Sequence, residues 1–175
     1  MASQLMGLGS LKSLLSNPQR SYLWEIRVLN PQGGSSTTPA MLTVMAETAK
    51  IPKRSHEVIS IPYKQTAGIV VYGKDKLTHL FSCTFRENEN SVIYNMIRKW
   101  QNAMIDARSG VANGPYQTDV FCALLDVNGN DTTVIKLKGA WISDIDEPQL
   151  SYADGTGLLK YGVTFSYDYF ETNQD

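Results

Sequence analysis

The stretch THLFSCTFRENENSVIYNMIRKWQN, residues 78–102, decides the fold, because the spacing of its apolar residues changes half-way along. In its first half apolar and polar side chains alternate, which is typical of a half-buried β-strand. From there on the apolar residues recur at helical spacing and form one stripe: Ile93, Met96, Ile97, Trp100, Met104 and Ala107. The pattern therefore predicts a strand over 78–87 followed at once by an amphipathic helix over 88–110.

The two ends of this helix carry recognisable signals. Asn90 or Ser91 can cap its first turn, because their side-chain oxygens accept hydrogen bonds from free backbone amides. Gly110 follows its last turn, where glycine commonly ends a helix. We expect this to be the one substantial helix of the chain.

On the N-terminal side of the helix the sequence predicts more strands. The connections between these strands are predicted at the polar residues 31–39, which Gly and Pro bound, and at the segment 51–54. The predicted strands cover residues 21–29, 40–49, 55–64 and 68–74.

On the C-terminal side the chain returns to strand. Residues 116–126 and 131–141 predict a hairpin across VNGN, because Asn128-Gly129 is the strongest short hairpin signal. Residues 157–171 alternate throughout and predict one long final strand. The fold class is therefore mostly β (α+β), an antiparallel β-barrel or sandwich with one packed helix.

Length and composition favour a single domain. The chain has 175 residues, within the ordinary size of one domain of about 100–200 residues. We expect a β domain over 21–175, preceded by an arm over 1–20 that is either flexible or docked on a neighbouring subunit. Leu5, Met6, Leu11, Leu14 and Leu15 supply the apolar side chains of this arm.

Charge and hydropathy exclude several classes of protein. The formal net charge is −1, from 16 basic and 17 acidic side chains, so non-specific nucleic-acid binding is not expected. No apolar run approaches the ~20 residues that span a bilayer. The start of the chain lacks the basic and strongly apolar blocks of a signal peptide. We expect a cytoplasmic protein without a membrane anchor.

The sequence contains no catalytic or metal-binding constellation. Cys83 and Cys122 lie in strand-like runs, which predicts two buried thiols. His56 and His79 lie in predicted strands without a partner motif, so both are interpreted as structural. Two cysteines and two histidines this far apart do not form a zinc pattern. We expect no cofactor and no enzyme activity.

The acidic stretch KGAWISDIDEPQLSYADG, residues 138–155, raises the question of whether it is an active site, a metal loop or a structural corner. It lacks the central glycine and the ligand register of a calcium loop. It fits either a solvated acidic turn or a contact loop on an assembly surface. A hydrolase built on Asp144, Asp146 or Asp154 and a small-molecule-binding β-barrel remain open as competing hypotheses.

The order of these elements resembles the tail tube protein of contractile-tailed bacteriophages, a family related to the tube protein of type VI secretion systems. The strand–helix unit 78–102 is similar to a family segment in which a strand leads through an acidic turn into a helix with an aromatic residue. The segment KGAWISDIDEPQLSYADGTGLLKYGVTFSYDYFE, residues 138–171, resembles its C-terminal signature. Ile142 stands where that family often has proline, and the arm is longer than usual. The departures leave open a main tube subunit or a tube initiator or terminator, and a secretion-system tube subunit is a further alternative.

The resemblance implies subunits that form hexameric rings, with strands joining between subunits into a large barrel. The rings stack into a hollow tube inside a contractile sheath, and DNA passes through without specific binding. The implied partners are other copies of the chain, the sheath protein, and the baseplate and tail-terminator proteins. The implied location is the virion tail, assembled in the host cytoplasm.

Two sets of residues are candidates for these roles. One is the predicted polar face of the strands, which would line the lumen: Thr43, Glu47, Glu57, Ser82, Thr84, Arg86, Thr164, Ser166 and Asp168. The other is a pair of loops of opposite charge, which would make contacts between rings or with the sheath: Lys50, Lys53 and Arg54 in one, and Asp144, Asp146 and Glu147 in the other. Stacked identical rings require complementary surfaces on opposite ends of one subunit.

Overall fold

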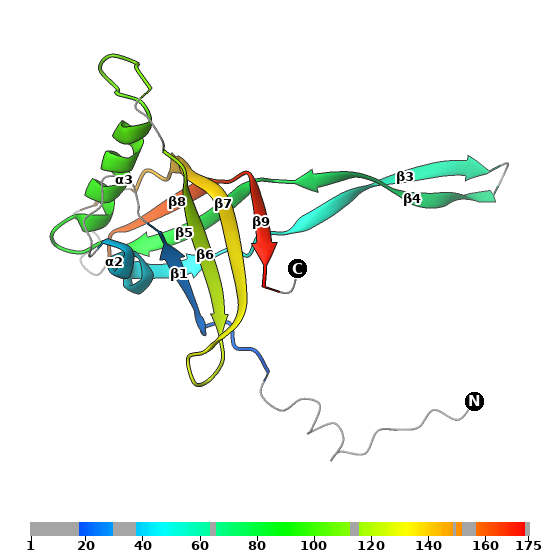
Figure 1. Ribbon diagram of the computed structural model, residues 1–175, viewed down its shortest axis with the longest axis horizontal. Coiled ribbons are helices and arrows are strands. Elements are labelled where there is room, and N and C mark those ends of the chain that lie inside the picture. The colour runs from blue at the N-terminus through cyan, green and yellow to red at the C-terminus, as the bar shows by residue number, and fades with distance from the viewer. Residues whose placement is uncertain are drawn as a thin grey trace.

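A computed structural model of the chain describes residues 18–29, 38–63, 66–112, 116–148, 150–151 and 157–173. The elements follow in the order β1 (Trp24–Val28), α2 (Thr38–Met45), β2 (Ala46–Ala49), β3 (Arg54–Tyr63), β4 (Thr66–Leu77), β5 (Leu80–Arg86), α3 (Val92–Met104), β6 (Thr118–Leu125), β7 (Asp131–Ile145), β8 (Lys160–Ser166) and β9 (Tyr169–Thr172). The fold is mostly β, as predicted (Figure 1).

All paired strands run antiparallel, and two sheets share one strand. The order is β1-β6-β7-β8-β5-β2, with β9 paired to β7. The first part of β7 pairs with β6 and β9, whereas its last residues, from Trp141 on, pair with β8. The described strands thus form a sandwich and do not close into a barrel. In the predicted fold class, the sandwich with a packed helix is confirmed.

The bend in β7 lies at Gly139. This residue has φ +64, a conformation that side-chain-bearing residues rarely adopt. The Asp168 carboxylate occupies the space that a side chain at 139 would need. The Asp168 amide also donates to the Lys138 carbonyl at 2.9 Å, so the chain stays beside β7 as it passes from β8 to β9. The single strand predicted over 157–171 was therefore wrong: it is two strands, β8 and β9.

The core lies between the two sheets and α3. Phe81, Phe85 and Phe165 are fully buried together with Trp100 of the helix. The Trp100 indole stacks against Phe165 at 6.0 Å between centroids and donates to the Tyr116 carbonyl at 2.9 Å. Burial of each of these side chains contributes about 2–3 kcal/mol. The strand–helix unit predicted from the change in periodicity is confirmed.

The ends of α3 differ from the prediction. Ser91 has φ 51 and makes no capping bond through its side chain. The free amides are instead satisfied by Glu87, which accepts from Ile93 at 3.1 Å and Tyr94 at 2.8 Å, so a carboxylate sits at the positive end of the helix. The helix stops at Met104 rather than near 110, because the backbone becomes extended at the next residue.

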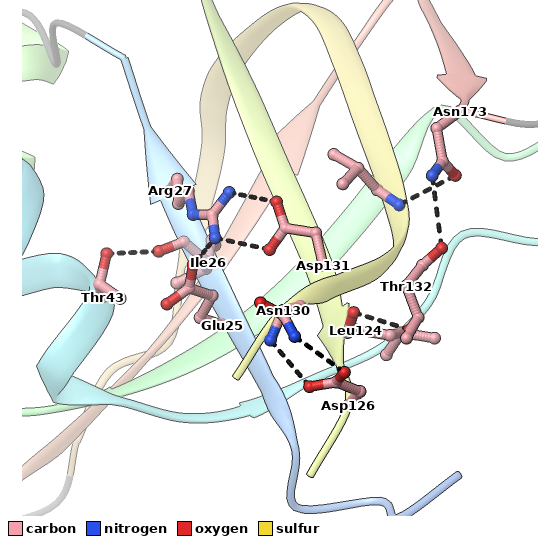
Figure 2. A network of polar contacts seen from close by, with 11 residues as sticks. Glu25, Ile26, Arg27, Thr43, Leu124, Asp126, Asn130, Asp131, Thr132 and Asn173 are labelled. Atoms are coloured by element: carbon pink, nitrogen blue, oxygen red, sulfur yellow. Dashed lines mark hydrogen bonds and ion pairs between the residues drawn. The ribbon is translucent and has the colours of Figure 1, made fainter. Parts of the chain in front are cut away.

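Residues 40–45 form part of α2 and not of a strand, so that part of the strand predicted over 40–49 was wrong. Only Ala46–Ala49 is strand. The helix buries Leu42 in the core, and the Thr43 hydroxyl donates to the Ile26 carbonyl at 2.6 Å (Figure 2). Helix α2 therefore covers part of the open edge of β1, which would otherwise present unpaired backbone groups.

The predicted β6–β7 hairpin is confirmed. Gly129 has φ +83, and the Asp126 carboxylate accepts from the amides of Asn128 at 2.7 Å and Asn130 at 2.8 Å. Figure 2 shows the neighbouring network, in which Arg27 of β1 donates two hydrogen bonds of 2.8 Å to Asp131. The loop and the outer face of this sheet are thus held by charged hydrogen bonds.

Strands β3 and β4 form a separate two-stranded sheet that projects from the sandwich (Figure 1). Both pair along most of their length, from Arg54 opposite Leu77 to Tyr63 opposite Thr66. Strand β4 covers 12 residues, which is longer than the predicted strand over 68–74. This projection is called the β3–β4 hairpin below.

Candidate assembly surfaces

A continuous polar surface covers the side of β5 and β8 that faces away from the core. Ser82, Thr84 and Arg86 point outward on β5, because the alternate residues between them are buried. On β8 the directly opposite residues are Thr164, Gly162 and Lys160. Ser82 and Thr164 are in hydrogen-bond contact through their hydroxyls, 3.3 Å apart. We call this surface, with its neighbours on β2 and the end of β7, the polar face.

The two cations of the polar face share one carboxylate. The Glu47 Oε1 atom lies 2.7 Å from Lys160 Nζ and 3.9 Å from Arg86 Nη2. The hydrogen bond from Lys160 lowers the pKa of Glu47, and the charges of Lys160 and Arg86 act in the same direction. Glu47 is therefore ionised at neutral pH and balances the basic side chains on this surface.

Two residues of the acidic stretch adjoin the same polar face. Asp144 is directly opposite Thr164, so both side chains lie on the same side of the sheet. The Asp146 amide donates to the Gly162 carbonyl at 2.8 Å, and its carboxylate lies over the space left by the missing side chain of that glycine. Glu147 follows as an exposed residue. Asp144, Asp146 and Glu147 are thus spread along the end of one strand, whereas Asp154 lies outside the described residues.

Other predicted lumen residues lie elsewhere. Ser166 is on β8 with the polar face, but Thr43 is on α2 against β1. Glu57 is on the β3–β4 hairpin, where it pairs with Lys76 at 3.3 Å. Asp168 lies between β8 and β9, with its carboxylate against Gly139. The structure therefore brings together Glu47, Ser82, Thr84, Arg86, Thr164 and Ser166, and not the other three.

The three basic residues of the predicted basic loop, Lys50, Lys53 and Arg54, have different environments. The Lys50 amide donates to the Ser82 carbonyl at 3.0 Å, which attaches the start of the loop to the edge of β5. Arg54 is the first residue of β3 and pairs with Asp75 at 2.7 Å. Its charge is therefore balanced within the β3–β4 hairpin. Lys53 is exposed.

The β3–β4 hairpin carries a large apolar surface that sequence reasoning missed. Its exposed large apolar side chains are Val58, Ile59, Ile61, Ile69, Val70, Val71 and Tyr72. Neighbouring members point to opposite faces, so both faces of the hairpin are apolar. The signal was present in the runs VISI and GIVVY, which do not alternate as a strand with one wet face does.

No catalytic arrangement is found among the described residues. They contain no group of three or more His, Cys, Asp or Glu side chains that could hold a metal ion. Cys83 and Cys122 are buried free thiols, as predicted, and burial raises their pKa values to about 12 and about 11. His79 lies at a bend with φ 50, not within a strand as predicted, and its Nδ1 contacts the Tyr167 carbonyl at 3.1 Å.

In the part of the chain that the structure describes, no helix combines the length and the apolar character needed to cross a membrane.

Comparison by sequence finds no matching family model and no matching curated protein. Comparison by structure finds the sheath/tube terminator of an extracellular contractile injection system, PVC, with a TM-score of 0.64 and 11% identity, covering 91% of this chain and 99% of that one. The tube-terminating cap of the anti-feeding prophage matches with a TM-score of 0.60 and 12% identity, over 91% and 93% of the two chains. A chain of the PVC sheath–tube complex matches with a TM-score of 0.59 and 10% identity, over 97% and 99%. The chain has the fold of these tube and terminator structures over nearly its whole length.

Proposed function

We propose that this chain is a structural, non-enzymatic subunit of a contractile tail or injection tube, and that copies of it assemble into stacked rings. The β3–β4 hairpin is the observation that carries the proposal. An isolated two-stranded hairpin is marginal in water, and this one exposes apolar side chains on both faces. A second copy of the chain is the partner that a repeating tube supplies for such a projection.

A contact of this kind is head-to-tail, since the hairpin of one subunit meets a different surface of the next. Such contacts generate closed rings when the rotation closes, and open stacks when it does not. Pairing between the sheets of adjacent subunits would also cover their open edges. The finer parts of this proposal are a hexameric ring and a lumen wide enough for DNA. The role of a tube initiator or terminator, in place of a main-tube subunit, is an alternative within it.

We assign the polar face to the lumen. It carries three acidic residues, Glu47, Asp144 and Asp146, against two basic ones, Arg86 and Lys160. A neutral-to-acidic wall repels phosphate, so a polyanion such as DNA slides past it without being held. Thr43, Glu57 and Asp168 are left out of this assignment, because the structure places them on other surfaces.

The sheath, the baseplate and the terminator remain the proposed external partners, with a tail assembly in the virion as the proposed location. Lys50, Lys53 and Glu147 are the charged candidates for contacts between rings or with the sheath. Arg54 is a weaker candidate than the sequence suggested, because Asp75 already balances its charge.

The test compares assembly of the wild-type chain with that of a hairpin variant. Ile59 and Val71 are directly opposite each other in the hairpin and both are exposed, so Ile59→Asp/Val71→Asp changes its surface and not the core. The wild type should form hollow rods or rings by negative-stain electron microscopy at high concentration. The variant should stay a folded monomer by light scattering and circular dichroism.

The matched control is Ile59→Val/Val71→Ile, which keeps the hairpin apolar and should assemble as the wild type does. Equal assembly by the wild type and the Asp variant would contradict the role of the hairpin. A wild type that remains monomeric, even when a purified tube end is added as a nucleus, would contradict the tube proposal itself.

A further inference from the structure

A hollow of about 320 Å³ opens at one end of the sandwich. Trp24 and Leu124, which are directly opposite each other on β1 and β6, form one side of it. Ala49 and Ile51, at the end of β2 and just beyond it, form the other. The hollow therefore lies where the two sheets part, and we call it the sandwich mouth.

The sandwich mouth is continuous with the hydrophobic core but open to solvent. Trp24 and Ala49 both pack against the buried cluster, and the fully buried Cys122 also lines the hollow. Ile51 is nevertheless 55% exposed. Apolar surface that is continuous with a core and open to water favours an apolar occupant.

The chain itself enters at the rim of this hollow. Gln19, Arg20 and Ser21 are among the residues that line it. The Gln19 side-chain amide donates to the Leu125 carbonyl at 2.9 Å, and the Leu23 amide donates to the Arg20 carbonyl at 3.1 Å. These bonds fix the first described residues beside the sandwich mouth, so residues 1–17 join the rest of the chain at that point.

The sequence of these residues has the composition of such an occupant. Residues 1–17, MASQLMGLGSLKSLLSN, carry a single charged side chain, Lys12. Leu11, Leu14 and Leu15 are spaced as i, i+3 and i+4, so in a helical turn they would share one face. Leu15 precedes Gln19 by four positions, a reach of up to about 13 Å. The leucines are therefore within reach of the hollow.

We propose that the N-terminal arm docks into the sandwich mouth of its own chain, with Leu11, Leu14 and Leu15 as the inserted side chains. The tether makes this docking intramolecular, which raises the effective concentration of the arm into the millimolar range, roughly, for a short linker. The same arm on another copy lacks this advantage in dilute solution. The docked arm completes the hydrophobic core of the free subunit, a role that is independent of tube assembly.

The test uses Trp24 as a reporter in the full chain at a dilution where it is monomeric. A 5-fluorotryptophan label gives separate fluorine resonances for the tryptophans, and Trp24→Phe assigns the one from the sandwich mouth. The variants are a chain without residues 1–16 and the full chain with Leu14→Asp/Leu15→Asp. Ser13→Asp/Ser16→Asp is the matched control, because it adds the same charge to the same part of the arm.

Removal of the arm and the leucine substitutions should shift the Trp24 resonance to the same new position and raise its accessibility to a soluble quencher several-fold. The serine control should keep the wild-type resonance. A synthetic peptide of residues 1–17, added to the shortened chain, should restore it.

Three results would overturn the proposal. An unchanged Trp24 resonance after removal of the arm would show that the arm does not reach the hollow. A wild-type resonance that moves on dilution would place the arm of a second copy there. A resonance that changes only after extraction with an organic solvent would identify a small apolar molecule as the occupant.

Discussion

Glu47 is the residue on which the charge of the polar face depends, because one carboxylate balances both Lys160 and Arg86. Replacement by glutamine should leave two basic side chains without a counter-charge. We expect Glu47→Gln to bind duplex DNA at low salt more tightly than the wild type does. The salt dependence of log K should become steeper by about one for each phosphate newly contacted. Fluorescence anisotropy with a labelled duplex measures both quantities.

Glu57→Gln is the matched control for this experiment. It makes the same change in net charge, but on the β3–β4 hairpin, where Glu57 pairs with Lys76. Equal DNA binding by the two variants would attribute the effect to overall charge and not to the polar face.

The buried thiols make stability fall in alkaline solution. In the unfolded chain Cys83 and Cys122 ionise near the ordinary thiol pKa of 9.0, whereas burial raises the folded pKa values to about 12 and about 11. Above pH 9 the unfolded state thus binds fewer protons than the folded state, and the free energy of unfolding decreases as the pH rises. We expect a loss of about 1 kcal/mol per thiol between pH 8 and pH 10.

Urea unfolding at pH 8, 9 and 10 measures this loss. The variant Cys83→Ala/Cys122→Ala should be less stable at pH 8 but lose less stability with pH, and the difference isolates the thiols from lysine and tyrosine titration. A parallel pH dependence in both proteins would mean that the thiols do not contribute.

Among the elements, β7 has the most demanding geometry, because it belongs to both sheets and bends at Gly139. Alanine at this position would combine a positive φ with a clash against the Asp168 carboxylate. We expect Gly139→Ala to destabilise the fold by about 2–4 kcal/mol, of which roughly 1–2 kcal/mol is backbone strain. Chemical denaturation measures the change.

Gly129→Ala separates the two causes, since Gly129 also has a positive φ but has no atom within 4 Å of the position of a side chain. It should cost only the strain, about 1–2 kcal/mol. Equal losses at the two glycines would mean that the contact between Asp168 and Gly139 adds nothing to the cost of the substitution.

The elements also show what could be read from the sequence. The change of periodicity at residues 78–102 predicted β5 and α3, and Asn128-Gly129 predicted the β6–β7 hairpin, because local spacing and turn chemistry determine both. Residues 40–45 were misread as strand, since their helical form depends on Leu42 in the core and Thr43 on the edge of β1. Those contacts are tertiary and leave no local signal.

The polar face could also be predicted in part from the sequence. Alternation along β5 and β8 was enough to select Ser82, Thr84, Thr164 and Ser166 as one surface. Only the sheet pairing shows that Asp144 lies on this surface too, or that Lys160 and Arg86 share Glu47. The break between β8 and β9 at Asp168 was not predictable, because the alternating pattern continues through it.

At the scale of the whole molecule, the sandwich and the β3–β4 hairpin are separable parts. Among the residues whose burial the structure describes, no core residue belongs to the hairpin, and Arg54 and Leu77 are directly opposite each other at its base. Replacement of residues 55–76 by Asn-Gly should therefore close the chain without disturbing the core. We expect a melting temperature within a few degrees of the wild type, and loss of rod formation by electron microscopy.

If the variant without the hairpin stays folded and still forms rods, the assembly role of the hairpin is contradicted. An unfolded product would show that the hairpin is needed for the fold itself, contrary to its position outside the core.

The pairing of β5 with β8 has a consequence for biosynthesis. Strand β5 ends at Arg86, and its partner β8 begins only at Lys160, so every residue between them must be translated before the two can meet. Until then the apolar side of β5 has only α3 and nearby segments to cover it, and contacts so distant in sequence form slowly. A growing chain on a ribosome therefore lacks the β8 half of the polar face and the Lys160 partner of Glu47. The subunit acquires both only after β8 has been made and has paired with β5.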